Sequence, residues 1–318
     1  MTDLWWPPLA AFLLAVALTW VVRPAARMVG AVATPKADRW HRGTIPLLGG
    51  VAIAGAVLIV APLLPRLSWS AWALVGGAGA LALVGLVDDF RPLRPQIKFL
   101  LQVIVTASVV AGGVRLSITG VPALDQLLTI VWLVGVTNAF NLLDNMDGLA
   151  AGIGLIAAAF RGYFFMLDGN VEGVWIAWSL AGALAGFLLF NFQPASIFMG
   201  DTGSLFIGML VGGLNVMGPY AYSRGTVAVL MLPVLVLLVP IFDTLFVSVA
   251  RTLAGRSIAQ GGRDHTSHRL VALGLSERGA VLALWGMALC SGLVAVLSYQ
   301  HGLPYTATLV GLLLAGLA

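Results

Sequence analysis

The stretch LALVGLVDDFRPLRPQIKFLL, residues 81–101, places two adjacent aspartates directly after an apolar run. A carboxylate at membrane depth costs roughly 2.5–3.5 kcal/mol on insertion scales, and such residues usually mark a binding site or an ion path. Asp88 and Asp89 therefore predict a polar site where a helix ends at a membrane surface. Two similar clusters follow, with Asp144 and Asp147 in NLLDNMDG and Asp201 in IFMGDTGS.

The composition supports a membrane setting for these clusters. The 318 residues are 60% hydrophobic and only 9% charged, whereas a soluble domain would carry about a quarter charged residues. We expect an all-α, polytopic integral membrane protein in which residues 1–318 form a single domain. The lone Cys290 excludes an intrachain disulfide or a cysteine-based metal site. The N-terminus lacks a basic region before its apolar run, so it predicts a first span rather than a cleavable signal.

Apolar runs predict ten or eleven membrane spans. Because a span needs about 20 apolar residues, we place them at residues 4–22, 47–64, 70–87, 97–114, 127–143, 149–167, 173–190, 204–218, 226–250, 279–298 and 304–318. The last is short. The long run at 226–250 contains Pro233 and Pro240, so we expect a kink there and an extension beyond the membrane.

Threading these spans alternately separates the basic residues. Thirteen fall on one side: Arg23, Arg27, Lys36, Arg39, Arg42, Arg91, Arg94, Lys98, Arg251, Arg256, Arg263, Arg269 and Arg278. Three fall on the other: Arg66, Arg115 and Arg224. The positive-inside rule makes the first side cytoplasmic and places the N-terminus outside. All three aspartate clusters lie on that cytoplasmic side, although no acidic residue entered the count. Arg161 falls inside a span and receives no function.

Each cluster has a chemical interpretation and a plainer one. Adjacent Asp88 and Asp89 need a cation, a metal ion or a shared proton to offset their repulsion, and Lys98 follows closely. A charged helix end at the membrane surface would also explain the pair. Asp201, between glycines at the start of a span, is placed to hold a metal beside an anion site at a helix N-terminus. It would equally serve as a simple N-cap.

The segment NAFNLLDNMDGLA spaces polar groups three residues apart. On one continuous helix Asn141, Asp144 and Asp147 would share an arc of about 120°. Such oxygen ligands suit Mg²⁺, which needs few protein carboxylates when phosphates supply the remaining ligands. The alternative is a polar helix C-terminus at which Asn and Gly act as caps.

Two further segments carry charge near the membrane. In GGRDHTSHRL, His265, His268 and Arg269 suit phosphate or sugar recognition, although a solvated basic loop explains them equally well. Asp243, inside VPIFDTLF, is expected to pair with a cytoplasmic arginine and to support the structure. Together the clusters predict a metal-capable acidic site, ringed by basic groups, that acts on a substrate held partly in the bilayer.

These motifs resemble the polyprenyl-phosphate N-acetylhexosamine-1-phosphate transferases, a family that includes the phospho-N-acetylmuramoyl-pentapeptide transferases. Six matching segments occur in the family's order: RWHRGTIPLLGG, GLVDDFRPLRPQIKFLLQ, NAFNLLDNMDGLA, NFQPASIFMGDTGSLFIG, PIFDTLFVSVAR and DHTSHRL. The resemblance implies about ten spans and a cytoplasmic active site. It also implies attack of a polyprenyl phosphate on the β-phosphate of a UDP-sugar, which releases UMP in the first membrane step of a cell-envelope glycan.

The resemblance also implies roles for individual residues, position by position. Mg²⁺, with Mn²⁺ as a substitute, would be held by Asn141 and Asp201. The acidic pair Asp88 and Asp89 would lie near the lipid phosphate as base or orienter, and its nucleophile role stays open. The remaining implied contacts are Lys98 to phosphate, Asp147 to uridine, Asn191 near the pyrophosphate, and His265, His268 and Arg269 over the sugar and pyrophosphate. Asp144 is a further expected substrate-binding residue without a defined role.

Three positions depart from the family's motifs. Ser267 takes a histidine position, Asn145 takes a glycine position, and Trp40 replaces a common lysine. The first departure argues against the muramoyl-pentapeptide branch, so we expect UDP-N-acetylglucosamine as the donor.

The expected partners are undecaprenyl or decaprenyl phosphate, a UDP-sugar and the lipid bilayer of the inner (cytoplasmic) membrane, without nucleic acid. A homodimer stays open. Two alternatives also stay open: a phospho-N-acetylmuramoyl-pentapeptide transferase, and a non-catalytic polyprenyl-phosphate binder or transporter.

Overall fold

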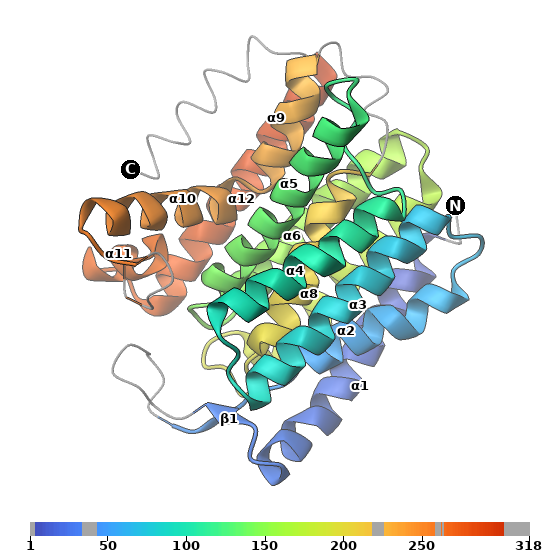
Figure 1. Cartoon of the computed structure of the whole chain (residues 1–318). Helices are drawn as coiled ribbons and strands as arrows, with labels where there is room; N and C mark the ends of the chain where they lie inside the picture. Colours follow the sequence, from blue (N-terminus) through green and yellow to red (C-terminus); the bar gives the residue numbers. More distant parts are fainter. Residues whose placement is uncertain (1–3, 34–42, 218–225, 258–261, 263, 302–318) are drawn as a thin grey trace.

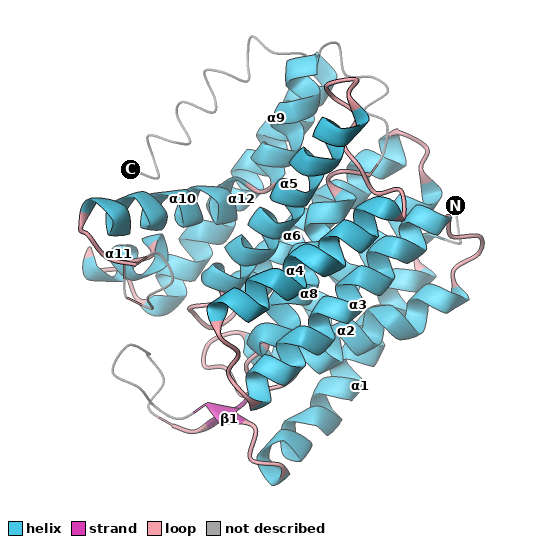
Figure 2. Ribbon diagram, viewed as in Figure 1, coloured by secondary structure: helices cyan, strands magenta, loops and turns pink. Residues whose placement is uncertain are grey.

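The chain folds as a bundle of helices (Figure 2). The computed structural model describes residues 4–33, 43–217, 226–257, 262 and 264–301. Within these ranges the strands are β1 (Val32–Ala33) and β2 (Ile45–Pro46), which form a short antiparallel pair. The helices are α1 (Trp6–Met28), α2 (Gly49–Val60), the 3₁₀ helix η2 (Ala61–Leu63), α3 (Trp69–Phe90), α4 (Pro95–Ala111), α5 (Pro122–Leu143), α6 (Leu149–Leu167), α7 (Val171–Asn191), α8 (Gly200–Leu214), α9 (Thr226–Val236), α10 (Leu238–Leu253), α11 (Thr266–Ala272) and α12 (Glu277–His301).

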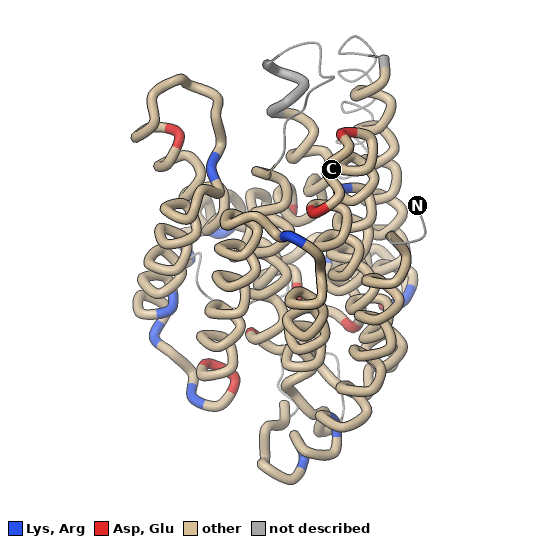
Figure 3. Tube along the Cα trace, turned by 90° about the vertical axis from the view of Figure 1, so that its right-hand side faces the viewer, with Lys and Arg blue, Asp and Glu red and all other residues tan. Residues whose placement is uncertain are grey.

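Six of these helices are long and apolar enough to cross a membrane: α1, α3, α5, α6, α7 and α12. Two shorter apolar helices cover Gly49–Leu63 and Pro95–Ala111. Figure 3 shows how few charged positions interrupt the helical trace. The prediction of an all-α, multi-pass membrane protein is confirmed. The predicted span at 304–318 lies outside the described residues.

The predicted span at 226–250 is two helices rather than one kinked helix. Helix α9 ends at Val236 and α10 begins at Leu238, and in Figure 1 the two run in clearly different directions. Pro240 explains the break, because its ring has no N–H to donate to the carbonyl of Val236 and clashes with that turn. Helix α10 thereby leaves the direction of α9 and carries Asp243 toward α11.

The core forms where α7 packs against α1 and α6, and where α8 packs against α3 and α5. Phe140, Phe187 and Phe206 are fully buried there. Gly85 lets α3 approach the first turn of α8 backbone to backbone, since a Cβ at this position would lie 2.4 Å from the carbonyl carbon of Asp201. This close approach places the end of α3, with its two aspartates, beside Asp201.

Helix α8 is also held at its far end. Arg161, on α6, is only 1% exposed. Its Nε donates to the carbonyl oxygen of Leu214 at 2.6 Å, and its Nη2 donates to that of Met217. The guanidinium lies 3.9 Å from the ring centroid of Phe165. A cation therefore occupies the C-terminal end of α8, where the carbonyls have no helical partners.

Helix ends bring the predicted clusters to one side of the bundle. Helices α3 and α5 end there, whereas α4, α6 and α8 begin there, and the β1–β2 pair lies beside them (Figure 1). The backbone N–H of Phe198 donates to the carbonyl oxygen of Pro46 at 2.8 Å, which joins β2 to the segment before α8. Residues far apart in the sequence therefore surround a common space.

Candidate active site

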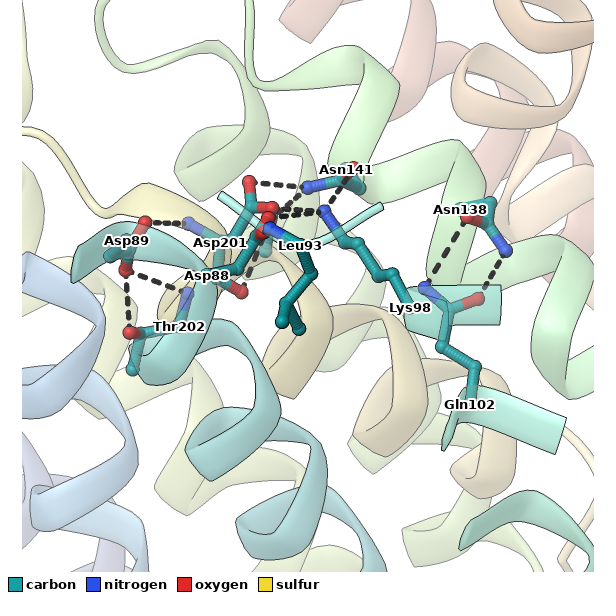
Figure 4. Close-up of polar contacts among 10 residues, drawn as sticks. Asp88, Asp89, Leu93, Lys98, Gln102, Asn138, Asn141, Asp201 and Thr202 are labelled. Atoms are coloured by element: carbon teal, nitrogen blue, oxygen red, sulfur yellow. Dashed lines mark hydrogen bonds and ion pairs between the residues drawn. The ribbon is translucent and has the colours of Figure 1, made fainter. Parts of the chain in front are cut away.

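Two pairs of polar side chains join α4 to α5 like rungs (Figure 4). Gln102 with Asn138 is called the inner rung, and Lys98 with Asn141 the outer rung. Lys98 and Gln102 are four residues apart on α4, and Asn138 and Asn141 are three apart on α5, so each pair lies on one helix face. In the inner rung the Nδ2 of Asn138 donates to Oε1 of Gln102 at 2.7 Å. In the outer rung the ammonium of Lys98 lies 3.3 Å from Oδ1 of Asn141. The Asn138–Gln102 bond thus holds α4 and α5 together next to the contact between Lys98 and Asn141.

Three oxygen-bearing side chains converge on the ammonium of Lys98 (Figure 4). Oδ2 of Asp88 lies 3.1 Å away, Oδ1 of Asn141 lies 3.3 Å away, and Oδ2 of Asp201 is in direct contact. The amide of Asn141 also donates to Oδ1 of Asp201 at 2.8 Å and to Oγ of Ser204 at 2.9 Å. A cation therefore offsets the acidic cluster, as the sequence required.

Asp89 caps α8 from outside that helix. Its Oδ1 accepts from the backbone N–H of Asp201 at 2.8 Å, and its Oδ2 accepts from the N–H and hydroxyl of Thr202 at 3.1 and 2.6 Å. Gly200 adopts φ +68°, and a Cβ there would lie 2.5 Å from the Asp89 carboxylate. Glycine therefore admits this carboxylate to the helix N-terminus, where negative charge is favoured.

The two adjacent aspartates consequently make different contacts. Asp88 accepts the backbone N–H of Leu93 at 2.5 Å and contacts Lys98 with its other oxygen. Asp89 faces only the first turn of α8 in its hydrogen bonds. Of the pair, Asp88 is the carboxylate directed toward the cationic centre, and Asp89 orders the helix that carries Asp201.

A cavity of about 910 Å³ opens beside this cluster. Nine of the predicted site residues line it: Asp88, Asp89, Asn141, Asp144, Asp147, Asn191, Asp201, His265 and His268. Lys98 does not line the cavity but contacts its carboxylates from α4. Arg269 lies outside the cavity wall, where its guanidinium stands 4.5 Å from the ring centroid of Phe246.

The turn from α5 to α6 forms one wall, and here the helical arc predicted for Asn141, Asp144 and Asp147 is wrong. Helix α5 ends at Leu143, and Gly148 has φ +76°, so Asp144 and Asp147 lie in the turn between the helices. The alternative of a helix end is right in part: Asn145 donates to the carbonyl oxygen of Leu142 in the last turn of α5, but Asp144 is the C-cap and Gly148 is the N-cap of α6. Oδ2 of Asp147 accepts the backbone N–H of Ala195 at 2.9 Å, which ties the turn to the segment before α8.

Asn191 makes its hydrogen bonds within the same wall. Its Oδ1 accepts the backbone N–H of Gly148 at 3.1 Å, and its Nδ2 donates to the carbonyl oxygen of Ile197 at 3.0 Å. The side chain is 3% exposed. Asn191 therefore shapes the cavity by joining two backbone segments.

The histidine segment forms another part of the cavity wall. Asp243 accepts from Nδ1 of His265 at 2.8 Å and from the backbone N–H of Thr266 at 2.7 Å. We expected an arginine to pair with Asp243; Arg251 does interact with it electrostatically, whereas its hydrogen bonds come from His265 and Thr266 at the start of α11. The break between helices α9 and α10 at Leu237 directs α10, and with it the Asp243 carboxylate, toward the start of α11.

An ion pair holds the segment that precedes α11. Arg251 donates to both carboxylate oxygens of Asp264, at 2.8 and 2.7 Å, in the bidentate geometry that favours a strong contact. These bonds lower the pKa of the Asp264 carboxyl to about 2. Four of the basic residues that the sequence assigns to the cytoplasmic side lie outside the described residues: Lys36, Arg39, Arg42 and Arg263.

Sequence reasoning missed several parts of the cavity wall. Val32 and Ala33 of β1 and Ile45 of β2 line it, and no chemical signal marks these small apolar residues. Glu277 also lines it, and Gln193 donates a hydrogen bond to that carboxylate. The position of Glu277 at the start of a span next to a basic loop was the available signal.

The residues present fit a hard divalent cation. The described residues contain no group of three or more His, Cys, Asp or Glu arranged to hold a metal. However, two carboxylates and an amide oxygen already surround one positive charge, that of Lys98. Oxygen donors of this kind suit Mg²⁺ when phosphate oxygens complete its coordination.

The chain is similar in sequence to a known protein family and to several characterised or named proteins. Residues 71–219 match the model of the glycosyl transferase family 4. A probable undecaprenyl-phosphate N-acetylglucosaminyl 1-phosphate transferase from Bacillus subtilis is 35% identical over 84% of this chain and 77% of its own length. A decaprenyl-phosphate N-acetylglucosaminephosphotransferase from Mycolicibacterium smegmatis is 36% identical over 92% and 82%. A phospho-N-acetylmuramoyl-pentapeptide-transferase from Moorella thermoacetica is 34% identical over 82% and 86%.

The fold and the cavity define a multi-pass membrane protein with an acidic site centred on a lysine ammonium. The chain belongs to glycosyl transferase family 4, the polyprenyl-phosphate sugar-1-phosphate transferases that its six ordered motifs predicted.

Proposed function

We propose that the protein transfers N-acetylglucosamine-1-phosphate from UDP-N-acetylglucosamine to a polyprenyl phosphate. A phosphate oxygen of the lipid forms a bond to the β-phosphorus of the UDP-sugar, and the bond from that phosphorus to the bridging oxygen breaks. The products are polyprenyl-pyrophosphoryl-N-acetylglucosamine and UMP. Relatives named as undecaprenyl- and decaprenyl-phosphate N-acetylglucosamine phosphotransferases support this choice.

One observation carries the proposal: the oxygens of Asp88, Asn141 and Asp201 surround a single cationic position at the edge of a large polar cavity. Phosphoryl transfer requires mainly positioning and charge stabilisation, since a phosphate oxyanion needs little deprotonation near neutral pH. A cation centre beside a cavity of about 910 Å³ supplies both requirements.

At the acidic centre, where the lipid phosphate would meet the pyrophosphate of the donor, Asn141 and Asp201 would hold Mg²⁺, which when bound neutralises pyrophosphate charge. Lys98 would then leave their oxygens and stabilise the phosphate groups, because the ammonium and a metal cannot share one set of close oxygen contacts. Asp88 orients Lys98. Asp89 holds the first turn of α8 and is a positioning residue, since both of its oxygens already accept hydrogen bonds from that turn.

At the donor end, the cavity would receive the UDP-sugar between two walls. Asp144 and Asp147 lie on the wall formed by the α5–α6 turn, and His265 and His268 lie on the wall formed by α11. The imidazoles suit contacts to the pyrophosphate and the sugar. Arg269 lies outside that wall, so we assign it to the α10–α11 contact with Phe246.

We also propose that the cavity opens on the cytoplasmic side of the inner membrane and that the N-terminus lies outside. The basic residues of the loops on the cavity side outnumber those on the other side, which supports this orientation by the positive-inside rule. A cytoplasmic opening would admit a soluble nucleotide sugar while the lipid phosphate remains in the bilayer.

The test combines purified protein, Mg²⁺ and undecaprenyl phosphate with a panel of donors. We expect UMP release and a lipid-linked product with UDP-N-acetylglucosamine. The panel includes UDP-N-acetylmuramoyl-pentapeptide, because one relative bears that activity in its name. Absence of UMP release with every donor would refute the transferase, and preference for the pentapeptide donor would refute the sugar assignment.

A further inference from the structure

One side-chain hydrogen bond joins the two segments of the cavity wall at the end proposed to bind the UDP-sugar. Oγ of Ser267, in the first turn of α11, donates to Oδ1 of Asn145, in the α5–α6 turn, at 2.7 Å. Ser267 is 1% exposed, and Asn145 is half-buried and lines the cavity. A glycine at position 145 would have no side chain to accept this bond.

Each partner is fixed on its own side of the contact. Nδ2 of Asn145 donates to the carbonyl oxygen of Leu142 at 3.0 Å, which orients its amide and directs Oδ1 toward α11. On the other side, Asp243 holds the start of α11 through His265 and the N–H of Thr266. The bond therefore connects two independently anchored segments rather than two free side chains.

These segments carry the polar groups of the donor end. The α5–α6 turn bears Asp144 and Asp147, and α11 with its preceding residue bears His268 and His265. All four line the cavity. A bond between the segments sets how far the imidazoles stand from the carboxylates. The contacts around Lys98, in contrast, involve α3, α4, α5 and α8 and do not include Asn145 or Ser267.

We propose that Asn145 and Ser267 are a positioning pair that holds the histidine segment against the nucleotide-sugar end of the cavity. The proposal rests on the function proposed above and assigns the pair to one substrate. Loss of the bond lets α11 withdraw from the α5–α6 turn and weakens contacts to the UDP-sugar. The polyprenyl-phosphate end keeps its geometry, because packed helices determine it.

The experiment is a double-mutant cycle with Ser267→Ala, Asn145→Ala and the double variant. Because a buried hydrogen bond contributes about 1 kcal/mol and its loss leaves a polar atom unpaired, we expect each single variant to raise the KM for UDP-N-acetylglucosamine about five- to tenfold. The KM for polyprenyl phosphate should stay unchanged. The double variant should match the single ones, since the two changes remove the same bond.

Two further variants separate positioning from general destabilisation. Ser267→Thr retains the hydroxyl and should keep the UDP-sugar KM closer to wild type than Ser267→Ala does. Ser291→Ala removes a buried hydroxyl of α12 that bonds only within its own helix to Ala288, at 3.0 Å, and should change neither KM. Additive effects in the cycle, or equal increases in both KM values, would overturn the proposal. If Ser267→Ala does not fold, Asn145→Ala and Ser267→Thr carry the same comparison.

Failure of the proposed function is distinguishable from failure of the pair. If wild-type protein releases no UMP with any donor, the transferase proposal fails, and binding of UDP is measured directly by calorimetry. Weaker UDP binding by Ser267→Ala than by wild type would still support the pair. Equal binding by both, or no UDP binding by wild type, would overturn it.

Discussion

The acidic centre and the histidine segment are built differently, although both face the same cavity. The acidic centre is positioned where α3, α4, α5 and α8 pack, and Asp89 and Lys98 bridge these helices. The histidine segment packs against α12 through α11, and polar contacts of Asp243, Asp264 and Ser267 hold its beginning in addition. Helix packing therefore dominates at the end assigned to the lipid phosphate, whereas individual polar bonds contribute more at the end assigned to the nucleotide sugar.

The largest effect should come from the acidic centre. Asp201→Asn removes a carboxylate charge but retains a side chain of similar size, so the bundle should remain folded. Because metal stabilisation of developing charge is worth several kcal/mol, we expect kcat to fall about a hundredfold or more. UMP release and the thermal unfolding midpoint in detergent measure the two quantities. Unchanged turnover in a folded variant would remove Asp201 from the metal site.

A second test asks whether Lys98 occupies the position of a metal. Lys98→Met removes the ammonium that contacts Asp88, Asn141 and Asp201. Without this competing charge, Mn²⁺ should bind the substrate-free protein about tenfold more tightly, while turnover falls. Electron paramagnetic resonance measures the free Mn²⁺. Weaker Mn²⁺ binding would mean that Lys98 and the metal do not share these oxygens.

A third test separates the adjacent aspartates. Asp89→Ala removes the three hydrogen bonds that the Asp89 carboxylate accepts from the first turn of α8. Loss of a helix cap costs about 1–2 kcal/mol of stability. We expect a lower free energy of unfolding for Asp89→Ala than for Asp88→Ala. Thr202→Val is the matched control, since it removes only the hydroxyl contact. Equal stability of the two aspartate variants would contradict the capping role.

The sequence predicted which segments meet but not the direction in which each side chain points. Consecutive residues of a helix point about 100° apart, so a motif with two adjacent aspartates does not say which one caps α8. The same rotation separates His268, which lines the cavity, from Arg269, which lies outside it. His265 also lines the cavity, but it is the extended residue that precedes α11, so its contact with Asp243 rather than helical spacing places it there.

The fold, like the site, could be predicted only in part. Apolar runs and basic loops predicted the helical bundle and the gathering of the clusters on one side of it, because both depend on composition. The helix end at Leu143 and the break at Leu237 depend on local backbone geometry and tertiary contacts instead. For that reason the shared helical arc of Asn141, Asp144 and Asp147 was predicted wrongly.

The smallest effect concerns the histidine segment and pH. Arg251 lowers the pKa of Asp264 to about 2, below the value of about 3.9 expected in an unfolded chain. The pair's stabilisation is therefore fully present above the unfolded pKa and declines as pH falls toward 2. The unfolding midpoint of Asp264→Asn should lie below that of wild type at pH 7, and the gap should narrow between pH 4 and pH 2. A gap that is constant with pH would exclude the ion pair as its cause.

The clamping of α8 has a mechanical consequence. A carboxylate from α3 holds its positive end and a guanidinium from α6 holds its negative end, so both poles of the helix dipole are matched by opposite charges. Sliding α8 along its axis in either direction would separate one of these charges from its pole. The helix therefore acts as a fixed strut, and Asp201 in its first turn keeps its position relative to α3 and α6.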